Sequence, residues 1–259
     1  MKRITQAGLV YYQFETWGAL RHGIFTRKGG VSRAPFDALN LGGNVGDDPK
    51  AVRCNHDRMY AVLGVDGARA CTVWQVHSTD IVMVNAPVPG RRWLAQADAM
   101  MTDRADVVLA QRYADCTPVF YFDPTKGVIA LAHAGWRGTV QGISGAVVRA
   151  MERSYGSHPS NIQAAIGPSI GPSRYQVGEE VVAAVQEHFG TTAGLIRRDS
   201  ADGTAYFDLW AANRLDLERA GVEQIEVAGI CTAENTDEFF SHRAEIARTG
   251  RFGALLSLT

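Results

Sequence analysis

The chain has 259 residues, of which 46% are hydrophobic and 20% are charged, and its formal net charge at pH 7 is −1. This near-neutral balance argues against nucleic acid as the main partner, because phosphate backbones attract strongly basic surfaces. No apolar run approaches the roughly 18 residues of a membrane-spanning helix, and the amino-terminal segment alternates apolar with polar residues, unlike a secretory signal. We therefore expect a cytoplasmic protein that binds neither nucleic acid nor a membrane.

Short runs of β-branched and aromatic residues, bounded by Gly, Pro, Asp or Asn, recur along the whole chain and predict β-strands. In chain order they cover residues 10–14, 23–27, 71–77, 81–85, 107–113, 119–122, 128–133, 162–166 and 225–230. The runs at 119–122 and 128–133 flank the turn Asp-Pro-Thr-Lys-Gly and predict an antiparallel hairpin. We therefore expect mixed rather than purely parallel sheets.

Helical patterns lie between the predicted strands. Asp-Pro at 48–49 supplies an N-cap and a first-turn proline, which predict the start of a helix. Apolar residues at spacings of three and four predict another helix from Val140 to about Tyr155, and two more patterns cover 179–189 and 208–220. These elements predict an α/β fold of mixed β-sheets covered by helices. Since no repeat or long linker interrupts the chain, we expect a single domain over residues 1–259.

Three predicted strands end in, or run into, a side chain that can bind a metal. These side chains are His77, Cys116 and His133. Two imidazoles and one thiolate suit zinc or copper, and three protein ligands leave a fourth position for water or substrate, as is typical of catalytic sites. Because the three residues are far apart along the chain, only a folded sheet would bring them together.

Each of these residues also has an ordinary structural interpretation. A single histidine at a strand end is more often a hydrogen-bonded structural residue, and a lone buried cysteine is usually inert. The four cysteines include no Cys-x-x-Cys pair, so neither a redox pair nor a zinc finger is expected. The surroundings favour a site, because His133 is followed by a Gly-Trp-Arg-Gly turn and His77 follows Trp74 and Gln75.

A series of ordered motifs resembles the YfiH family, which is also called the laccase-domain or polyphenol oxidase family and has relatives named purine nucleoside phosphorylases. The motifs are QVHS at 75–78, ADAMMT at 97–102, ADCTPV at 114–119, HAGWRGT at 133–139, IGPSIGP at 166–172, YQVGEE at 175–180, CT at 231–232, FFSHR at 239–243 and TGR at 249–251. The resemblance implies a YfiH-like fold and a metal site made of His77, Cys116 and His133. These three residues would then be both metal ligands and catalytic residues.

The names in this family point to different substrates. A multicopper oxidase needs many histidines, commonly in His-x-His pairs, whereas this chain has seven histidines and no such pair. Copper-dependent polyphenol oxidation therefore ranks as a side activity of bound Cu²⁺. The resemblance implies that adenosine, inosine or methylthioadenosine reacts with phosphate to give base and ribose 1-phosphate, with adenosine deamination beside it. We expect Arg27, Arg137 and Arg243 to bind phosphate, and Asn40 and Asp115 to contact the ribose.

Two other classes of function stay open. Cys116 would be a nucleophile and His133 its base in a cytoplasmic cysteine or zinc amidohydrolase of peptidoglycan precursor editing, which the resemblance also supports. Metal content separates the cysteine hydrolase hypothesis from the nucleoside phosphorylase hypothesis, because a thiolate bound to Zn²⁺ is a poor nucleophile. A non-catalytic metal protein would instead need a fourth protein ligand, for which Cys231 and His242 are candidates. The sequence decides neither between Zn²⁺ and Cu²⁺ nor the oligomeric state.

Overall fold

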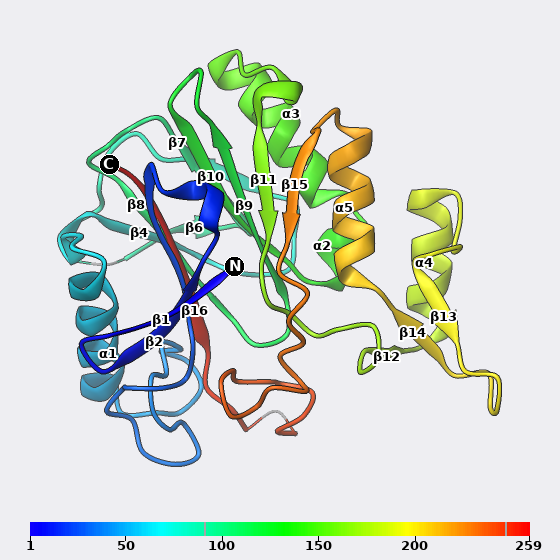
Figure 1. The fold of residues 1–259 in the computed structure, drawn as a ribbon, viewed down its shortest axis with the longest axis horizontal. Coiled ribbons are helices and arrows are strands. Elements are labelled where there is room, and N and C mark those ends of the chain that lie inside the picture. Colours follow the sequence, from blue (N-terminus) through cyan, green and yellow to red (C-terminus); the bar gives the residue numbers. More distant parts are fainter. Residues whose placement is uncertain (91, 247) are drawn as a thin grey trace.

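The structure is a computed structural model that describes residues 1–90, 92–246 and 248–259 (Figure 1). Helices flank β-sheets, as the predicted α/β fold requires. The strands are β1 (Lys2–Gln6), β2 (Leu9–Gln13), β3 (Leu20–Phe25), β4 (Ala70–Trp74), β5 (Ile81–Met83), β6 (Trp93–Gln96), β7 (Ala99–Thr102), β8 (Val108–Tyr113), β9 (Thr117–Asp123), β10 (Val128–Ala134), β11 (Gln163–Ile166), β12 (Gln176–Val177), β13 (Ile196–Arg198), β14 (Ala205–Phe207), β15 (Gln224–Val227) and β16 (Phe252–Leu258). The helices are α1 (Pro49–Val62), α2 (Trp136–Thr139), α3 (Ile143–Tyr155), α4 (Glu179–Phe189) and α5 (Leu209–Arg219), with 3-10 turns η1 (Glu15–Trp17), η2 (Gly67–Arg69) and η3 (Pro159–Asn161).

Within the described ranges, the strands form two large sheets and a small one. The first sheet has the order β1-β2-β3-β16-β8-β4-β6, and the second has the order β15-β11-β9-β10-β7-β5. The small sheet, β12-β14-β13, lies with α4 at the right-hand edge of Figure 1. The predicted mixed character is confirmed, because β4 runs parallel to β6 and β8 whereas β16 runs antiparallel to β3 and β8. The predicted hairpin is also confirmed, as β9 and β10 pair antiparallel.

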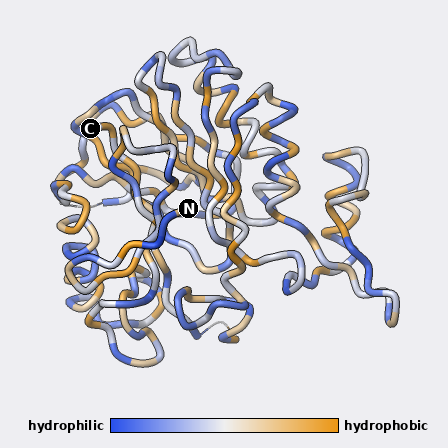
Figure 2. Tube along the Cα trace, viewed as in Figure 1, coloured by the Kyte–Doolittle hydropathy of each residue, from blue (hydrophilic) through white to orange (hydrophobic). Residues whose placement is uncertain are grey.

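One part of the apolar core joins the two large sheets. Leu109 on β8, Phe120 on β9, Leu131 on β10 and Leu256 on β16 belong to one cluster and are fully buried. Figure 2 shows hydrophobic stretches along these inner strands, whereas hydrophilic residues are frequent on the outer helices. Burial of each such side chain contributes roughly 1.5–3 kcal/mol. Because β8, β9 and β10 meet in this core, the loops at their ends hold fixed relative positions.

The helices begin where local chemistry places their caps. The Asp48 carboxylate accepts a hydrogen bond from the Lys50 amide at the start of α1, as predicted. The helix predicted from Val140 begins instead at Ile143, because Gly142 adopts φ 76° and separates it from the short α2. The other two predicted helices match α4 and α5. In the part of the chain that the structure describes, none of the helices has the length and apolarity needed to cross a membrane.

Candidate metal centre and active-site cavity

The fold brings together the three potential metal ligands that the sequence indicates. His77 lies in the loop after β4, Cys116 immediately precedes β9, and His133 is the second-last residue of β10. One donor atom from each lies within 4.8 Å of the others. The pairing of β9 with β10 places His133 opposite Pro118, beside Cys116. Among the described residues, neither Cys231 nor His242 belongs to this donor group, so a fourth protein ligand is not part of it.

Asp98 holds two of these ligands in place, and the sequence analysis did not single it out. This fully buried carboxylate lies just before β7 and accepts a 2.8 Å hydrogen bond from Nδ1 of His133. Its other oxygen accepts hydrogen bonds from the amides of Val76 (3.1 Å) and Ser78 (2.7 Å), which flank His77. Strand β4 ends at Trp74, three residues before the predicted end. A carboxylate behind a histidine fixes the tautomer and leaves Nε2 free to bind a metal.

The charges in this cluster favour a thiolate. Burial alone would raise the pKa of Cys116, but the neighbouring His133 and His77 outweigh it and lower that pKa to about 6. Burial would lower the pKa of His133, yet the Cys116 thiolate and the Asp98 carboxylate together raise it to about 9. A thiolate is the form of cysteine that binds metals and attacks electrophiles.

Asp115 is the residue that directs Cys116 into the site. Its backbone has φ 84°, which is uncommon for a residue with a side chain. The carboxylate is held by the hydroxyl of Thr232 (2.7 Å) and the amide of Arg243 (2.7 Å), so both of its oxygens are in use. These bonds join the turn before β9 to the carboxy-terminal loops.

Gly135 leaves the room in which the ligands meet. A Cβ atom at this position would lie 2.7 Å from Cδ2 of His77 and 3.0 Å from Sγ of Cys116. We therefore expect Gly135→Ala to lower metal affinity by at least about tenfold, since displaced ligands lose their geometry. Chelator competition measures this affinity. Gly18→Ala is the control, because its Cβ would meet nothing within 4 Å, and equal affinity in both variants would contradict this account.

Cys116 should be chemically distinct from the other cysteines. In metal-free protein at neutral pH its lowered pKa predicts rapid alkylation, which slows as the pH falls through about 6. In metal-loaded protein we expect protection, because the thiolate is then committed to the metal. Cys54, which is also half-buried, serves as the internal comparison. Mass spectrometry of labelled peptides measures both rates, and rapid labelling of Cys116 at full metal occupancy would favour a free nucleophile instead.

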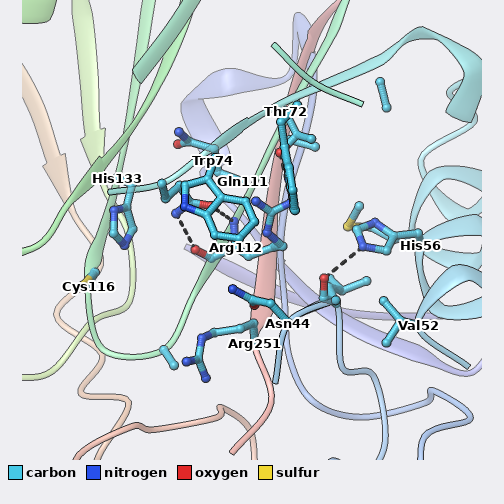
Figure 3. A pocket seen from close by; sticks show the side chains of 18 of the residues that line it. Asn44, Val52, His56, Thr72, Trp74, Gln111, Arg112, Cys116, His133 and Arg251 are labelled. Atoms are coloured by element: carbon cyan, nitrogen blue, oxygen red, sulfur yellow. Dashed lines mark hydrogen bonds between the residues drawn. The ribbon is translucent and has the colours of Figure 1, made fainter. Parts of the chain in front are cut away.

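A cavity of about 550 Å³ opens beside the ligand group (Figure 3). It is lined by residues of α1, β4, β6 and β8, by the loop at 41–44, by the three ligands, and by His242 and Arg251. Trp74 and Trp93 form an aromatic wall, with their rings edge to face and centroids 4.1 Å apart. Gln75 also lines the cavity, but its amide bonds the backbone of Arg112. The cavity has the size and mixed lining of a small-molecule site.

Two of the residues predicted to bind substrate lie outside the lining of this cavity. Arg27 makes an ion pair with Glu245 at 2.9 Å and stacks on Phe240, 4.4 Å from the ring centroid. Asn40 is buried, and its side-chain oxygen accepts a 2.8 Å hydrogen bond from the amide of Arg251. Both side chains thus have structural partners in the loops around the cavity, and direct contact with substrate stays a prediction.

The other predicted contacts also lie outside the lining. Asp115 is next to Cys116, but its oxygens are engaged as described above. Arg243 packs over Tyr175, 5.1 Å from the ring centroid. Arg137 stacks on Trp136 and lines a separate, open depression between α2 and α4. Among the described residues, the arginines that line the main cavity are the exposed Arg53 and the half-buried Arg112 and Arg251, none of which was predicted from the sequence.

Comparison with known proteins identifies relatives over nearly the whole chain. The family model described as "Multi-copper polyphenol oxidoreductase laccase" matches residues 21–259. The chain is 38% identical to the purine nucleoside phosphorylase YlmD of Geobacillus stearothermophilus, covering 90% of this chain and 88% of the relative. It is 40% identical to a purine nucleoside phosphorylase of Streptomyces coelicolor, covering 95% and 98% of the two chains.

Solved structures agree with these matches. The crystal structure of YlmD from Geobacillus stearothermophilus superposes with a TM-score of 0.93 at 35% identity, covering 99% of this chain and 98% of that one. The crystal structure of the Bacillus licheniformis protein YfiH superposes with a TM-score of 0.91 at 31% identity over the same shares. The predicted YfiH-like fold is therefore confirmed.

Proposed function

We propose that this chain, which belongs to the YfiH-like family of multi-copper polyphenol oxidoreductase laccases, is a metal-dependent purine nucleoside phosphorylase. It would convert adenosine, inosine or methylthioadenosine and phosphate into base and ribose 1-phosphate, in the cytoplasm. The observation that carries the proposal is the His-Cys-His donor group at the wall of a nucleoside-sized cavity. Relatives named purine nucleoside phosphorylase, at 34–40% identity over most of the chain, support it.

The residues present fit a zinc ion. Imidazole and thiolate are both zinc ligands, three protein ligands are the number typical of a catalytic zinc site, and the Asp98 carboxylate fixes His133 as metal-bound histidines usually are fixed. Zinc held by His77, Cys116 and His133 would supply Lewis acidity toward an oxygen or nitrogen of the bound substrate. We propose Zn²⁺ as the native metal. Cu²⁺ in the same donors would allow slow phenol oxidation as a side activity, but one three-donor group does not provide a multicopper centre.

The protein's own side chains have separable tasks in this reaction. Trp74 and Trp93 offer flat apolar faces against which a purine can pack. Asp98 keeps the proton of His133 on Nδ1, so the ring presents Nε2 to the cavity. We propose that adenosine deamination uses the same cavity.

Elemental analysis of protein purified without added metal, followed by a nucleoside panel, tests this function. We expect one zinc per chain, phosphate-dependent release of base, loss of activity with a chelator, and recovery with zinc. A metal-free protein that is fully active would contradict the proposal.

One arrangement favours a second function. Asp98, His133 and Cys116 form the orienting acid, base and nucleophile of a cysteine hydrolase, with the thiolate already favoured. In this role the protein would cleave an amide of a peptidoglycan precursor. Amide cleavage by protein that holds no metal, together with no action on nucleosides, would select this function over phosphorolysis.

A further inference from the structure

Two half-buried arginines line the cavity, and the structure describes no carboxylate partner for either of them. Arg112 on β8 donates to the hydroxyl of Thr72 (3.0 Å) and the carbonyl of Val73 (3.0 Å). Arg251 donates to two backbone carbonyls of its own loop, Thr249 (3.1 Å) and Gly250 (2.8 Å). Within the described residues, neither guanidinium takes part in an ion pair. By contrast, arginines elsewhere, such as Arg3, Arg27 and Arg198, are matched with acids.

Neighbouring groups compensate this positive charge only in part. Burial lowers the pKa of both guanidinium groups, and the charge of Arg251 lowers that of Arg112 further. The groups with negative charge that act on Arg251 are Cys116 and Asp115, which are otherwise committed. Removing two cations partly from water in one cavity costs free energy, and an anion bound between them would offset this cost.

The loop at 40–42 contacts Arg251 and holds it in position. The side-chain oxygen of Asn40 accepts hydrogen bonds from the amides of Gly42 (2.9 Å) and Arg251 (2.8 Å). A Cβ on Gly42 would lie 2.7 Å from Cγ of Arg251, so only glycine lets this stem pack closely. In Figure 3 the guanidinium of Arg251 lies on the side of the cavity toward Cys116, with the amide of Asn44 nearby. The arginine is thus pre-positioned beside the ligand group.

We propose that Arg112 and Arg251 form the subsite for inorganic phosphate, the co-substrate of the function proposed above. Guanidinium forks match phosphate oxygens in geometry and charge. A phosphate oxygen held here would attack C1′ of the ribose while the glycosidic C–N bond breaks. The electron pair of that bond goes to the base nitrogen, which takes up the proton of hydrogen phosphate. The products are ribose 1-phosphate and the free base, so atoms and charges balance.

The test uses the zinc-loaded full chain and the variants Arg112→Gln and Arg251→Gln. Loss of one charge-assisted fork should raise the KM for phosphate by roughly 10- to 100-fold. The KM for nucleoside and the zinc content should stay near wild type. Arg251→Lys should give an intermediate KM, since charge is kept but the fork is lost. Arg149→Gln, on the exposed surface of α3, is the control and should match wild type.

Direct binding separates this proposal from the function on which it rests. Without nucleoside, inorganic phosphate should raise the melting temperature of wild type and of Arg149→Gln, but not of the two cavity variants. If the wild type is no phosphorylase yet shows this pattern, the subsite stands and the function fails. If wild-type turnover requires phosphate but both folded variants keep its KM, the subsite is wrong and the function stands.

The guanidinium groups of Arg112 and Arg251 would also bind the phosphate group of a nucleotide. Adenosine monophosphate is therefore assayed beside adenosine plus phosphate. Tight binding of the monophosphate that is lost in the variants, with no phosphate effect on adenosine turnover, would overturn the assignment to inorganic phosphate.

Discussion

Cys116→Ala should remove stoichiometric zinc and lower phosphate-dependent turnover by at least about a thousandfold, since a catalytic metal supplies several kcal/mol at the transition state. The reason is geometric: only His77 and His133 would remain of the donor group within 4.8 Å. Cys116 is only partly buried against the core, so the melting temperature of the variant should stay close to that of metal-free wild type.

The matched control is Cys54→Ala on α1, outside the donor group. It should retain zinc and full activity. Elemental analysis and steady-state assays of the two variants measure the difference. Full zinc occupancy in Cys116→Ala would show that the metal centre is misassigned, whereas loss of activity with zinc retained would identify Cys116 as a nucleophile.

Asp98→Asn should lower zinc affinity by about 10- to 100-fold, although Asp98 is not itself in the donor group. An amide cannot serve both sets of donors that the carboxylate serves. Its NH₂ group must face either Nδ1 of His133 or the amides of Val76 and Ser78, all of which donate to Asp98. Either choice turns His133 into the wrong tautomer or releases the loop that carries His77.

Chelator competition measures the affinity of this variant, and Asp103→Asn, an exposed change just after β7, is its control. The melting temperature of metal-free Asp98→Asn should also fall, because buried amides lose their acceptor. Unchanged zinc affinity in Asp98→Asn would show that the carboxylate has only a structural role.

Local sequence patterns predicted the elements that local chemistry determines. The helix expected at 179–189 is α4 (Glu179–Phe189) to the residue, and the β9–β10 hairpin follows its turn. Strand β16 was not predicted, although it lies in the middle of the larger sheet between β3 and β8. Its run Phe-Gly-Ala-Leu-Leu-Ser-Leu is apolar without alternation, and its neighbours are far away in the sequence, so only the folded sheet defines it.

The site likewise contains residues that could be predicted from the sequence and residues that could not. The metal ligands His77, Cys116 and His133 could be predicted because imidazole and thiolate groups at strand ends are typical of metal sites. Asp98 could not, since a single acid before an apolar strand gives no sign of which imidazole it will meet. Arg27 is followed closely by two glycines, a pattern that can bring backbone amides to an anion, but a Cβ on Gly30 would lie 2.0 Å from the carbonyl oxygen of Ala38. That glycine therefore admits another part of the chain rather than an anion.

The most direct test of phosphorolysis is quantification of ribose 1-phosphate formed from adenosine and phosphate by the zinc-loaded protein. We expect ribose 1-phosphate and adenine in equal amounts, with no base released when phosphate is left out. Release of adenine at the same rate without phosphate, or no base release under either condition, would contradict this expectation.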